Sequence, residues 1–173
     1  MYDRIQLKHN LGVNTMRQRY LSVLVENHSG VLSRIAGLFS RRGYNIDSLS
    51  VGTTESPNIS RMTIGVTCDD KLLEQMMKQL HKLIPVLKVN ELNQTNSKMH
   101  ELAIIKVRAG VKQRREVMDL AEIFKGNVVD VSDATLTVSL LGSQDKIDAA
   151  VQQLKTYGIK EMIRTGATGI QRG

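Results

Sequence analysis

The sequence predicts an α+β protein made of two consecutive domains that share one order of elements, βαββαβ. The chain has 173 residues, enough for two small domains. Apolar residues recur with a period of two in some segments and at three- and four-residue spacing in others. The order of these segments in the first half repeats in the second. Each copy is expected to form an antiparallel four-stranded sheet with two helices on one face, the ferredoxin-like arrangement.

The first copy begins with a strand, a turn and a helix. Apolar residues alternate along 21–26, which predicts a strand, and the turn Asn27–Gly30 follows. From Val31 the spacing becomes helical, until Arg41, Arg42 and Gly43 close the helix. The remaining elements are predicted as a strand over 44–53, a turn at Pro57-Asn58, a strand over 61–68, a helix from Asp69 or Asp70 to before Pro85, and a strand over 86–92.

The second copy follows a polar, turn-rich stretch, residues 93–99, which is predicted to be a linker. Its strands are expected at 101–108, 127–131, 135–141 and 159–164, with one helix around 117–124 and another capped by Ser143. The predicted organisation is an N-terminal extension over 1–16, a first domain over 17–92, the linker over 93–99 and a second domain over 100–173.

Composition limits the classes of function. The formal charge of +7 is spread over the chain, so a nucleic-acid groove is not expected, although a basic nucleic-acid-binding module stays an alternative. The predicted central strands contain only Tyr20 as an aromatic residue, too few to stack bases. Cys68 is the only cysteine, which excludes intrachain disulfides and cysteine-based metal sites and favours a cytoplasmic setting. No apolar run is long enough to predict a membrane span.

The turn at 27–30 is the best candidate for a ligand site. The first N–H groups of a helix have no partners within it and lie at the positive end of its dipole, so they can hold a small anion. On the turn alone, the favoured alternative is that Ser29 caps the helix and Gly30 eases a tight connection. The four histidines are dispersed and no catalytic or metal motif is present, which favours a binding or regulatory role over an enzyme.

The predicted strands of the first copy carry apolar residues on both alternations. Leu24 opposes Leu21 and Val23, and Ile46 lies beside the Leu49–Val51 segment. Two helices can cover only one face of a sheet, so a bare apolar face or edge is expected. Such a face predicts self-association, most simply as a symmetric homodimer.

Two groups of segments resemble a known family. LVENHSGVLSRIAGLFSRRGYNIDSLSVG, ISRMTIGV and LEQMMKQLHKLIPVLKV resemble the amino-terminal ACT domain of the small regulatory subunit of acetohydroxyacid synthase, also called acetolactate synthase. EIFKGNVVDVS and GATGIQRG resemble its carboxy-terminal domain. The resemblance implies a non-catalytic subunit in the biosynthesis of valine, leucine and isoleucine. This subunit would activate a separate catalytic subunit and confer feedback inhibition by valine.

The resemblance also implies which residues act. Valine would bind at the interface of two ACT domains of a homodimer, with its carboxylate on backbone N–H groups and its ammonium group on amide or carbonyl oxygens. The implied ligand residues are Asn27, His28, Ser29, Gly30, Val31, Leu32, Asn45 and Ile46. His28 stands where an acidic residue is expected. Ser60, Arg61 and Met62 are expected to touch the catalytic subunit.

No cofactor or metal is expected in this chain. Thiamine diphosphate, magnesium and FAD would belong to the catalytic subunit, and neither nucleic acid nor a membrane is an expected partner. An ACT-type amino-acid sensor of a different enzyme is the second alternative.

Overall fold

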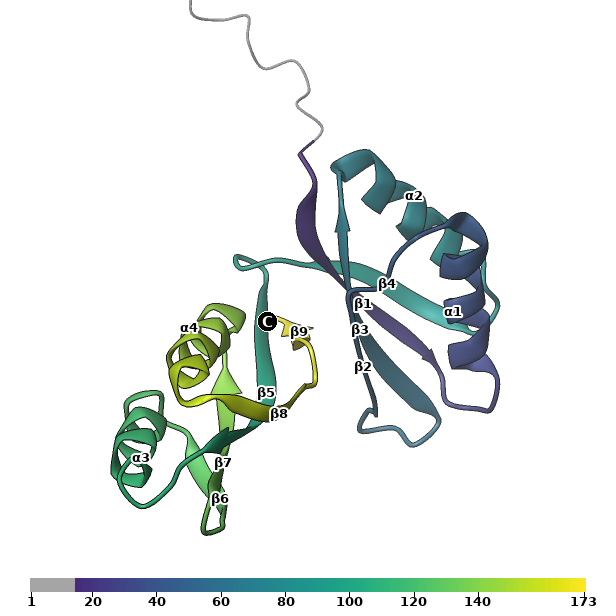
Figure 1. The fold of residues 1–173 in the computed structure, drawn as a ribbon. Coiled ribbons are helices and arrows are strands. Elements are labelled where there is room, and N and C mark those ends of the chain that lie inside the picture. The colour runs from purple at the N-terminus through teal and green to yellow at the C-terminus, as the bar shows by residue number, and fades with distance from the viewer. Residues whose placement is uncertain (1–14) are drawn as a thin grey trace, which may run out of the picture.

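The computed structural model describes residues 15–173, so most of the predicted N-terminal extension, residues 1–14, lies outside the described residues. Two antiparallel sheets each carry two helices on one face (Figure 1). The strand order is β2-β3-β1-β4 in the first sheet and β6-β7-β5-β8 in the second, where a further strand, β9, pairs with β5. The prediction of two ferredoxin-like βαββαβ domains is confirmed, with one additional strand.

The bounds of the elements are as follows. The first domain contains β1 (Arg17–Glu26), α1 (Val31–Arg42), β2 (Ser48–Thr53), β3 (Ile59–Cys68), α2 (Asp70–Leu80) and β4 (Val86–Leu92). The second contains β5 (Ser97–Arg108), α3 (Arg114–Ile123), β6 (Asn127–Val131), β7 (Thr135–Gly142), α4 (Gln144–Leu154), the 3-10 helix η1 (Lys155–Tyr157), β8 (Ile159–Arg164) and β9 (Thr168–Gln171).

Each domain has its own aliphatic core between its sheet and its helices. In the first, alternate residues of β1 and β3 meet apolar residues of α1 and α2, and Phe39 is the one fully buried aromatic side chain in the described part of the chain. Asp69 accepts a hydrogen bond from the N–H of Leu72 at 2.7 Å and Ser143 accepts one from the N–H of Lys146 at 3.4 Å. These side chains cap α2 and α4, as the sequence predicted.

The strand predicted over 44–53 begins only at Ser48. Gly43 adopts the left-handed conformation, with φ 68°, and the N–H of Tyr44 donates to the carbonyl of Phe39 at 2.9 Å, so Gly43 and Tyr44 cap the end of α1. The Tyr44 ring then packs edge-on against Phe39. Residues 44–47 are therefore a connection, and the predicted start of the strand is wrong by four residues.

Residues 93–99 are divided between a turn and a strand. Asn93 Oδ1 accepts from the N–H groups of Thr95 and Asn96, at 3.0 and 2.9 Å, which closes a turn. Ser97 is buried and begins β5, because β9 pairs with Ser97 through His100. The short β9, which was not predicted from the sequence, thus extends β5 into the expected linker.

The helix-free face of the first sheet carries both polar and apolar residues and is partly covered. Ser22 and Thr63 lie on it and are buried, and the N–H of Gly169 in β9 lies 3.3 Å from Thr63 Oγ1. Ile46 and Leu49 pack against the helix-side core instead. The face expected to be bare and apolar is therefore mixed in polarity and partly covered in the first domain, whereas the edge strand β2 exposes Val51. β9 lies between the two domains and contacts β3 and β4 as well as β5 (Figure 1).

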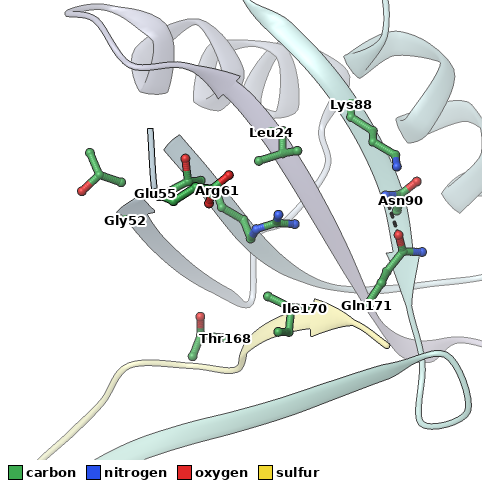
Figure 2. A pocket seen from close by; sticks show the side chains of 11 residues that line it. Leu24, Gly52, Glu55, Arg61, Lys88, Asn90, Thr168, Ile170 and Gln171 are labelled. Carbon is green, nitrogen blue, oxygen red and sulfur yellow. Dashed lines mark hydrogen bonds between the residues drawn. The ribbon is translucent and has the colours of Figure 1, made fainter. Parts of the chain in front are cut away.

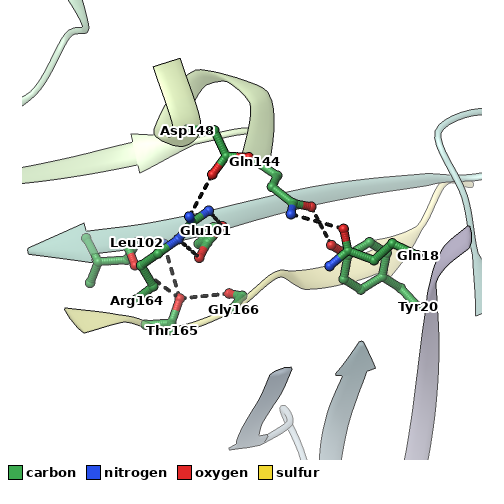
Figure 3. Close-up of polar contacts among 9 residues, drawn as sticks. All are labelled: Gln18, Tyr20, Glu101, Leu102, Gln144, Asp148, Arg164, Thr165 and Gly166. Carbon is green, nitrogen blue, oxygen red and sulfur yellow. Dashed lines mark hydrogen bonds and ion pairs between the residues drawn. The ribbon is translucent and has the colours of Figure 1, made fainter. Parts of the chain in front are cut away.

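A polar network also joins the domains (Figure 3). Tyr20 donates to Gln144 Oε1 at 2.5 Å, and Gln144 Nε2 donates to Gln18 at 3.0 Å. Beside them, Arg164 binds both oxygens of the buried Glu101, at 2.7 and 2.8 Å, and Asp148 at 2.6 Å. The hydrogen bond to Glu101 is the main cause that raises the pKa of Arg164 above its usual range. Burial, and then the Glu101 charge, raise the pKa of Tyr20, which therefore keeps its donor proton.

None of the helices within residues 15–173 has the length and apolar character that a membrane crossing requires.

Candidate functional site

The turn between β1 and α1 is fastened to the loop that connects β2 and β3. The N–H of Asn27 donates to the carbonyl of Asn58 at 2.7 Å, and its side-chain Nδ2 donates to the carbonyl of Pro57 at 2.7 Å. Asn27 therefore uses both of its nitrogen donors on the loop that the Pro57-Asn58 signal predicts. Its side-chain oxygen accepts no hydrogen bond from residues 15–173 and is the group that a ligand ammonium can use.

Helix α1 starts without a side-chain cap. Gly30 is the N-cap residue in the left-handed conformation, with φ 86° and ψ −12°, and no side chain bonds to the first N–H groups. The prediction that Ser29 caps the helix is therefore wrong. Glycine adopts this φ with the least strain, and a Cβ built at Gly30 meets nothing within 4 Å, so the turn is open on that side.

The first N–H groups of α1 are available to a ligand. In the described part of the chain, the N–H groups of Gly30 and Leu32 have no acceptor, and that of Val31 has only the carbonyl of His28 at 3.5 Å. All three lie at the positive end of the helix dipole. The arrangement fits a small carboxylate, and the side chain of Leu32, which is 44% exposed, supplies apolar surface beside it.

His28 is turned along the loop. Its Nε2 lies 3.1 Å from Glu26 Oε2 and its Nδ1 lies 3.0 Å from the carbonyl oxygen of Ser29, both at the exposed surface. The imidazole therefore links the turn to the end of β1 through these two contacts. The N–H groups of α1 do not depend on it.

The other predicted ligand residues, Asn45 and Ile46, follow the opposite end of α1. Asn45 Nδ2 donates to Asp47 Oδ1 at 2.6 Å, and Asp47 Oδ2 accepts from Thr67 of β3 at 2.8 Å, so this connection is fixed to the sheet. Helix α1 has 12 residues and is about 18 Å long at 1.5 Å per residue. The two ends of α1 lie far apart (Figure 1), so one chain does not bring the turn and Asn45 together.

The three residues expected to touch a catalytic subunit have different environments. Ser60 and Met62 are buried, 6% and 2% exposed, and Met62 belongs to the core. Arg61 is half-buried and its Nη1 donates to Ser22 Oγ at 2.9 Å, on the helix-free face of the sheet. Only Arg61 reaches a solvent-accessible cleft, whose volume is about 580 Å³ and which lies between the first sheet and β9 (Figure 2).

This cleft was not predicted from the sequence, because β9 forms its second wall. The only sequence signal for it was the GATGIQRG segment, which contains β9. Its lining residues are Leu24, Gly52, Thr53, Thr54, Glu55, Arg61, Lys88, Asn90, Thr168, Ile170 and Gln171.

Comparison with known proteins identifies both domains. Residues 21–88 match the AHAS small subunit-like ACT domain, and residues 100–173 match the family described as small subunit of acetolactate synthase. The probable acetolactate synthase small subunit of Archaeoglobus fulgidus is 48% identical over 153 residues, which cover 88% of this chain and 96% of that protein. The chain belongs to the acetolactate synthase small-subunit family.

Other members of the acetolactate synthase small-subunit family agree over nearly the same length. The acetolactate synthase isozyme 3 small subunit of Salmonella typhimurium is 48% identical over 157 residues, or 90% of this chain and 96% of that protein. The crystal structure of the acetolactate synthase small subunit from Thermotoga maritima superposes with a TM-score of 0.84 at 38% identity, covering 91% of this chain and 98% of that one. The predicted family and the ACT identity of the first domain are thus confirmed.

Proposed function

We propose that this small subunit activates the catalytic subunit of acetolactate synthase and makes it sensitive to valine. The observation that carries the proposal is the uncapped start of α1, where the N–H groups of Gly30 and Leu32 have no acceptor within residues 15–173. The carboxylate of a ligand would accept hydrogen bonds from these N–H groups, and Leu32 would contact the branched aliphatic side chain of that ligand. In this proposal the chain acts without a cofactor, and thiamine diphosphate, magnesium and FAD belong to the catalytic subunit.

The binding site is completed by a second copy of the chain. A two-fold axis that crosses the middle of α1 sets two copies of this helix antiparallel, which brings the turn of one copy against Asn45 and Ile46 of the other. The exposed surface of α1 carries small residues at helical spacing, so two such helices can approach closely. These residues are the exposed Ser33, Ala36 and Ser40 and the half-buried Gly37.

The edge of the first sheet supports the same dimer. Helix α2 packs against β4, which leaves α1 on the side of the sheet that ends in β2. β2 is an edge strand, and its Val51 is 45% exposed. Because α1 and β2 lie on the same side, one two-fold axis can pair both elements at once, and an unpaired edge strand is suited to such pairing.

Selectivity among aliphatic amino acids is expected to be modest. The ammonium group of valine would bind oxygens around Asn27 of one copy and Asn45 of the other, and Leu32 and Ile46 would surround the side chain. One methylene in an apolar pocket contributes about 1 to 3 kcal/mol, so leucine and isoleucine should bind at this site more weakly. Valine then inhibits because it binds the inhibited arrangement of the complex more tightly than the active one.

Reconstitution with a purified acetolactate synthase catalytic subunit tests the proposal. The full chain should raise the rate of acetolactate formation, and added valine should reverse this increase. A Gly30→Asp variant should still stimulate the catalytic subunit but should lose the response to valine, because its carboxylate occupies the start of α1. Absence of stimulation by the wild-type chain would contradict the proposal and favour an amino-acid sensor of a different enzyme.

A further inference from the structure

The cleft between the first sheet and β9 does not include the turn at 27–30, although Thr54 and Glu55 of the loop that holds this turn line it. Leu24 and Arg61 enter it from the face of the sheet that the helices do not cover, whereas α1 lies on the opposite face (Figure 1, Figure 2). Thr168, Ile170 and Gln171 of β9 form the other wall. The cleft is therefore built from both domains of one chain, and it does not need a second copy.

Two cations of the cleft have no acidic partner. Arg61 is half-buried and bonds to Ser22, and Lys88 is exposed on β4. Within residues 15–173, neither side chain forms an ion pair with a carboxylate. A half-buried guanidinium without a counter-ion interacts strongly with an anion, since its charge is only partly screened by water. Its planar fork fits a carboxylate with two parallel hydrogen bonds.

The rest of the lining selects among anions. Leu24 is half-buried and Ile170 is 59% exposed, and both line the cleft, so apolar surface is available beside the two cations (Figure 2). Glu55 also lines the cleft and disfavours an anion with more than one negative charge. A volume of about 580 Å³ is in the range of small-molecule sites.

We propose that this cleft binds a small aliphatic monocarboxylate, with its carboxylate on Arg61 beside Lys88 and its alkyl group against Leu24 and Ile170. A ligand in this position contacts β1, β3 and β4 of the ACT domain and β9 of the second domain at once. It therefore stabilises the present arrangement of the two domains. The proposal is independent of the valine site, which lies on the other face of the sheet.

Methyl NMR of the full-length protein, titrated with sodium 3-methylbutanoate, tests this site directly. The methyl signals of Leu24 and Ile170 should shift in a saturable manner. The neutral 3-methylbutanamide, which has nearly the same shape without the charge, should shift them little. If neither methyl signal responds to 3-methylbutanoate, the proposal is wrong. If inorganic phosphate binds as tightly as 3-methylbutanoate, the assignment to monocarboxylates is wrong.

Variants separate the role of Arg61 from general effects on the fold. Arg61→Gln should weaken the binding of 3-methylbutanoate about tenfold or more, because charge-assisted hydrogen bonds are lost, and Arg61→Lys should weaken it less. Arg115→Gln, which removes an exposed arginine of α3, should leave the affinity unchanged. Equal affinity in wild type and Arg61→Gln would overturn the proposal, provided that methyl signals outside the cleft confirm that the variant is folded.

The same variants distinguish this proposal from the valine site. Arg61→Gln should retain the heat of valine binding, and Gly30→Asp should retain the response of Leu24 and Ile170 to 3-methylbutanoate. If Gly30→Asp abolishes both responses, the monocarboxylate binds at the turn and the cleft site is wrong. If valine fails to bind while 3-methylbutanoate binds at the cleft, only the proposed valine site is wrong.

Discussion

The two domains have the same order of elements, but their first helices begin differently. In the ACT domain, α1 starts at Gly30 with φ 86°, and the N–H groups of Gly30 and Leu32 have no acceptor among the described residues. In the second domain, the N–H groups of Gln113, the N-cap residue of α3, and Arg114 both donate to the carbonyl of Gly110, at 2.9 and 3.0 Å, so the preceding turn occupies these two donors. The two helix starts therefore differ in the turn before the helix and not in the fold, because the N-cap N–H group is paired in the second domain and has no acceptor among the described residues in the first.

The helix-free faces of the two sheets also differ. The first carries Ser22 and Thr63 and is partly covered by β9. The second exposes Leu102, Ile104, Leu141 and Ile163, whose exposed fractions range from 37% to 66%. A single short strand therefore makes one sheet an internal contact surface and leaves the other open.

The comparison of the two helix starts predicts the largest effect. Gly30→Asp should abolish the heat of valine binding in calorimetry, whereas Gly110→Asp should leave it unchanged. A Cβ meets nothing within 4 Å at either position, but Gly30 has φ 86°, where a side chain strains the backbone, and Gly110 does not have a positive φ. Gly30→Asn, which tolerates positive φ and carries no charge, should retain more binding than Gly30→Asp. Loss of valine binding in Gly110→Asp would break the comparison.

The packing of β9 predicts the next largest effect. A Cβ at Gly169 would lie 2.5 Å from Met99, 3.0 Å from Leu92 and 3.1 Å from the carbonyl oxygen of Lys98. Gly169→Val should therefore displace β9 and lower the free energy of unfolding by about 2 kcal/mol, measured by chemical denaturation. Gly52→Val, at a strand position where a Cβ meets nothing within 4 Å, is the matched control and should cause no loss. Equal stability of the two variants would show that β9 does not pack as described.

The buried carboxylate of the second domain gives a similar or smaller effect. The Glu101 side chain is 5% exposed and binds Arg164, which is 27% exposed. Glu101→Ala should lower the free energy of unfolding by about 1 to 2 kcal/mol. The loss is limited because water can solvate the Arg164 guanidinium once its carboxylate partner is removed. Glu161→Ala, which removes the surface partner of Lys106, should leave the unfolding midpoint unchanged. A larger loss for Glu161→Ala would contradict this order.

The smallest effect concerns alkaline pH. Burial raises the pKa of Tyr20 above its ordinary value of 10.0, so the folded state keeps the proton that the unfolded state releases. This contribution to stability is complete below pH 10.0 and is lost as the pH rises through the raised pKa. Tyr20→Phe should therefore lose less stability than wild type between neutral and strongly alkaline pH in urea unfolding. Tyr44→Phe is the control, and the same flattening in it would contradict the assignment to Tyr20.

Local signals in the sequence predicted much of this molecule, and contacts between distant segments account for what was missed. The Asp69 and Ser143 caps and the change of period at Val31 depend on neighbouring residues, and the structure confirms them. The strand β9 has only four residues, too few to show a period of two. It forms because it pairs with β5 and contacts Thr63 and Asn90, which are distant in the sequence.

The candidate sites follow the same division. The turn at 27–30 was predicted as a place for a carboxylate. Its N–H groups are open because Ser29 does not cap the helix, whereas the residue type alone favours a cap. The distance between this turn and Asn45 follows from the length of α1. The cleft at Arg61 required the position of β9, which no local pattern gave.

The central claim is that each valine site is formed by residues from two copies of the chain. Subunit complementation tests this claim most directly. Gly30→Asp and Asn45→Ala each damage both sites of their own homodimer. A mixed dimer of the two variants contains one site with both defects and one intact site. Calorimetry of the mixture, after the subunits have exchanged, should therefore recover valine binding with wild-type affinity at a reduced number of sites. If the mixture binds no more valine than the separate variants, the turn and Asn45 do not form one shared site.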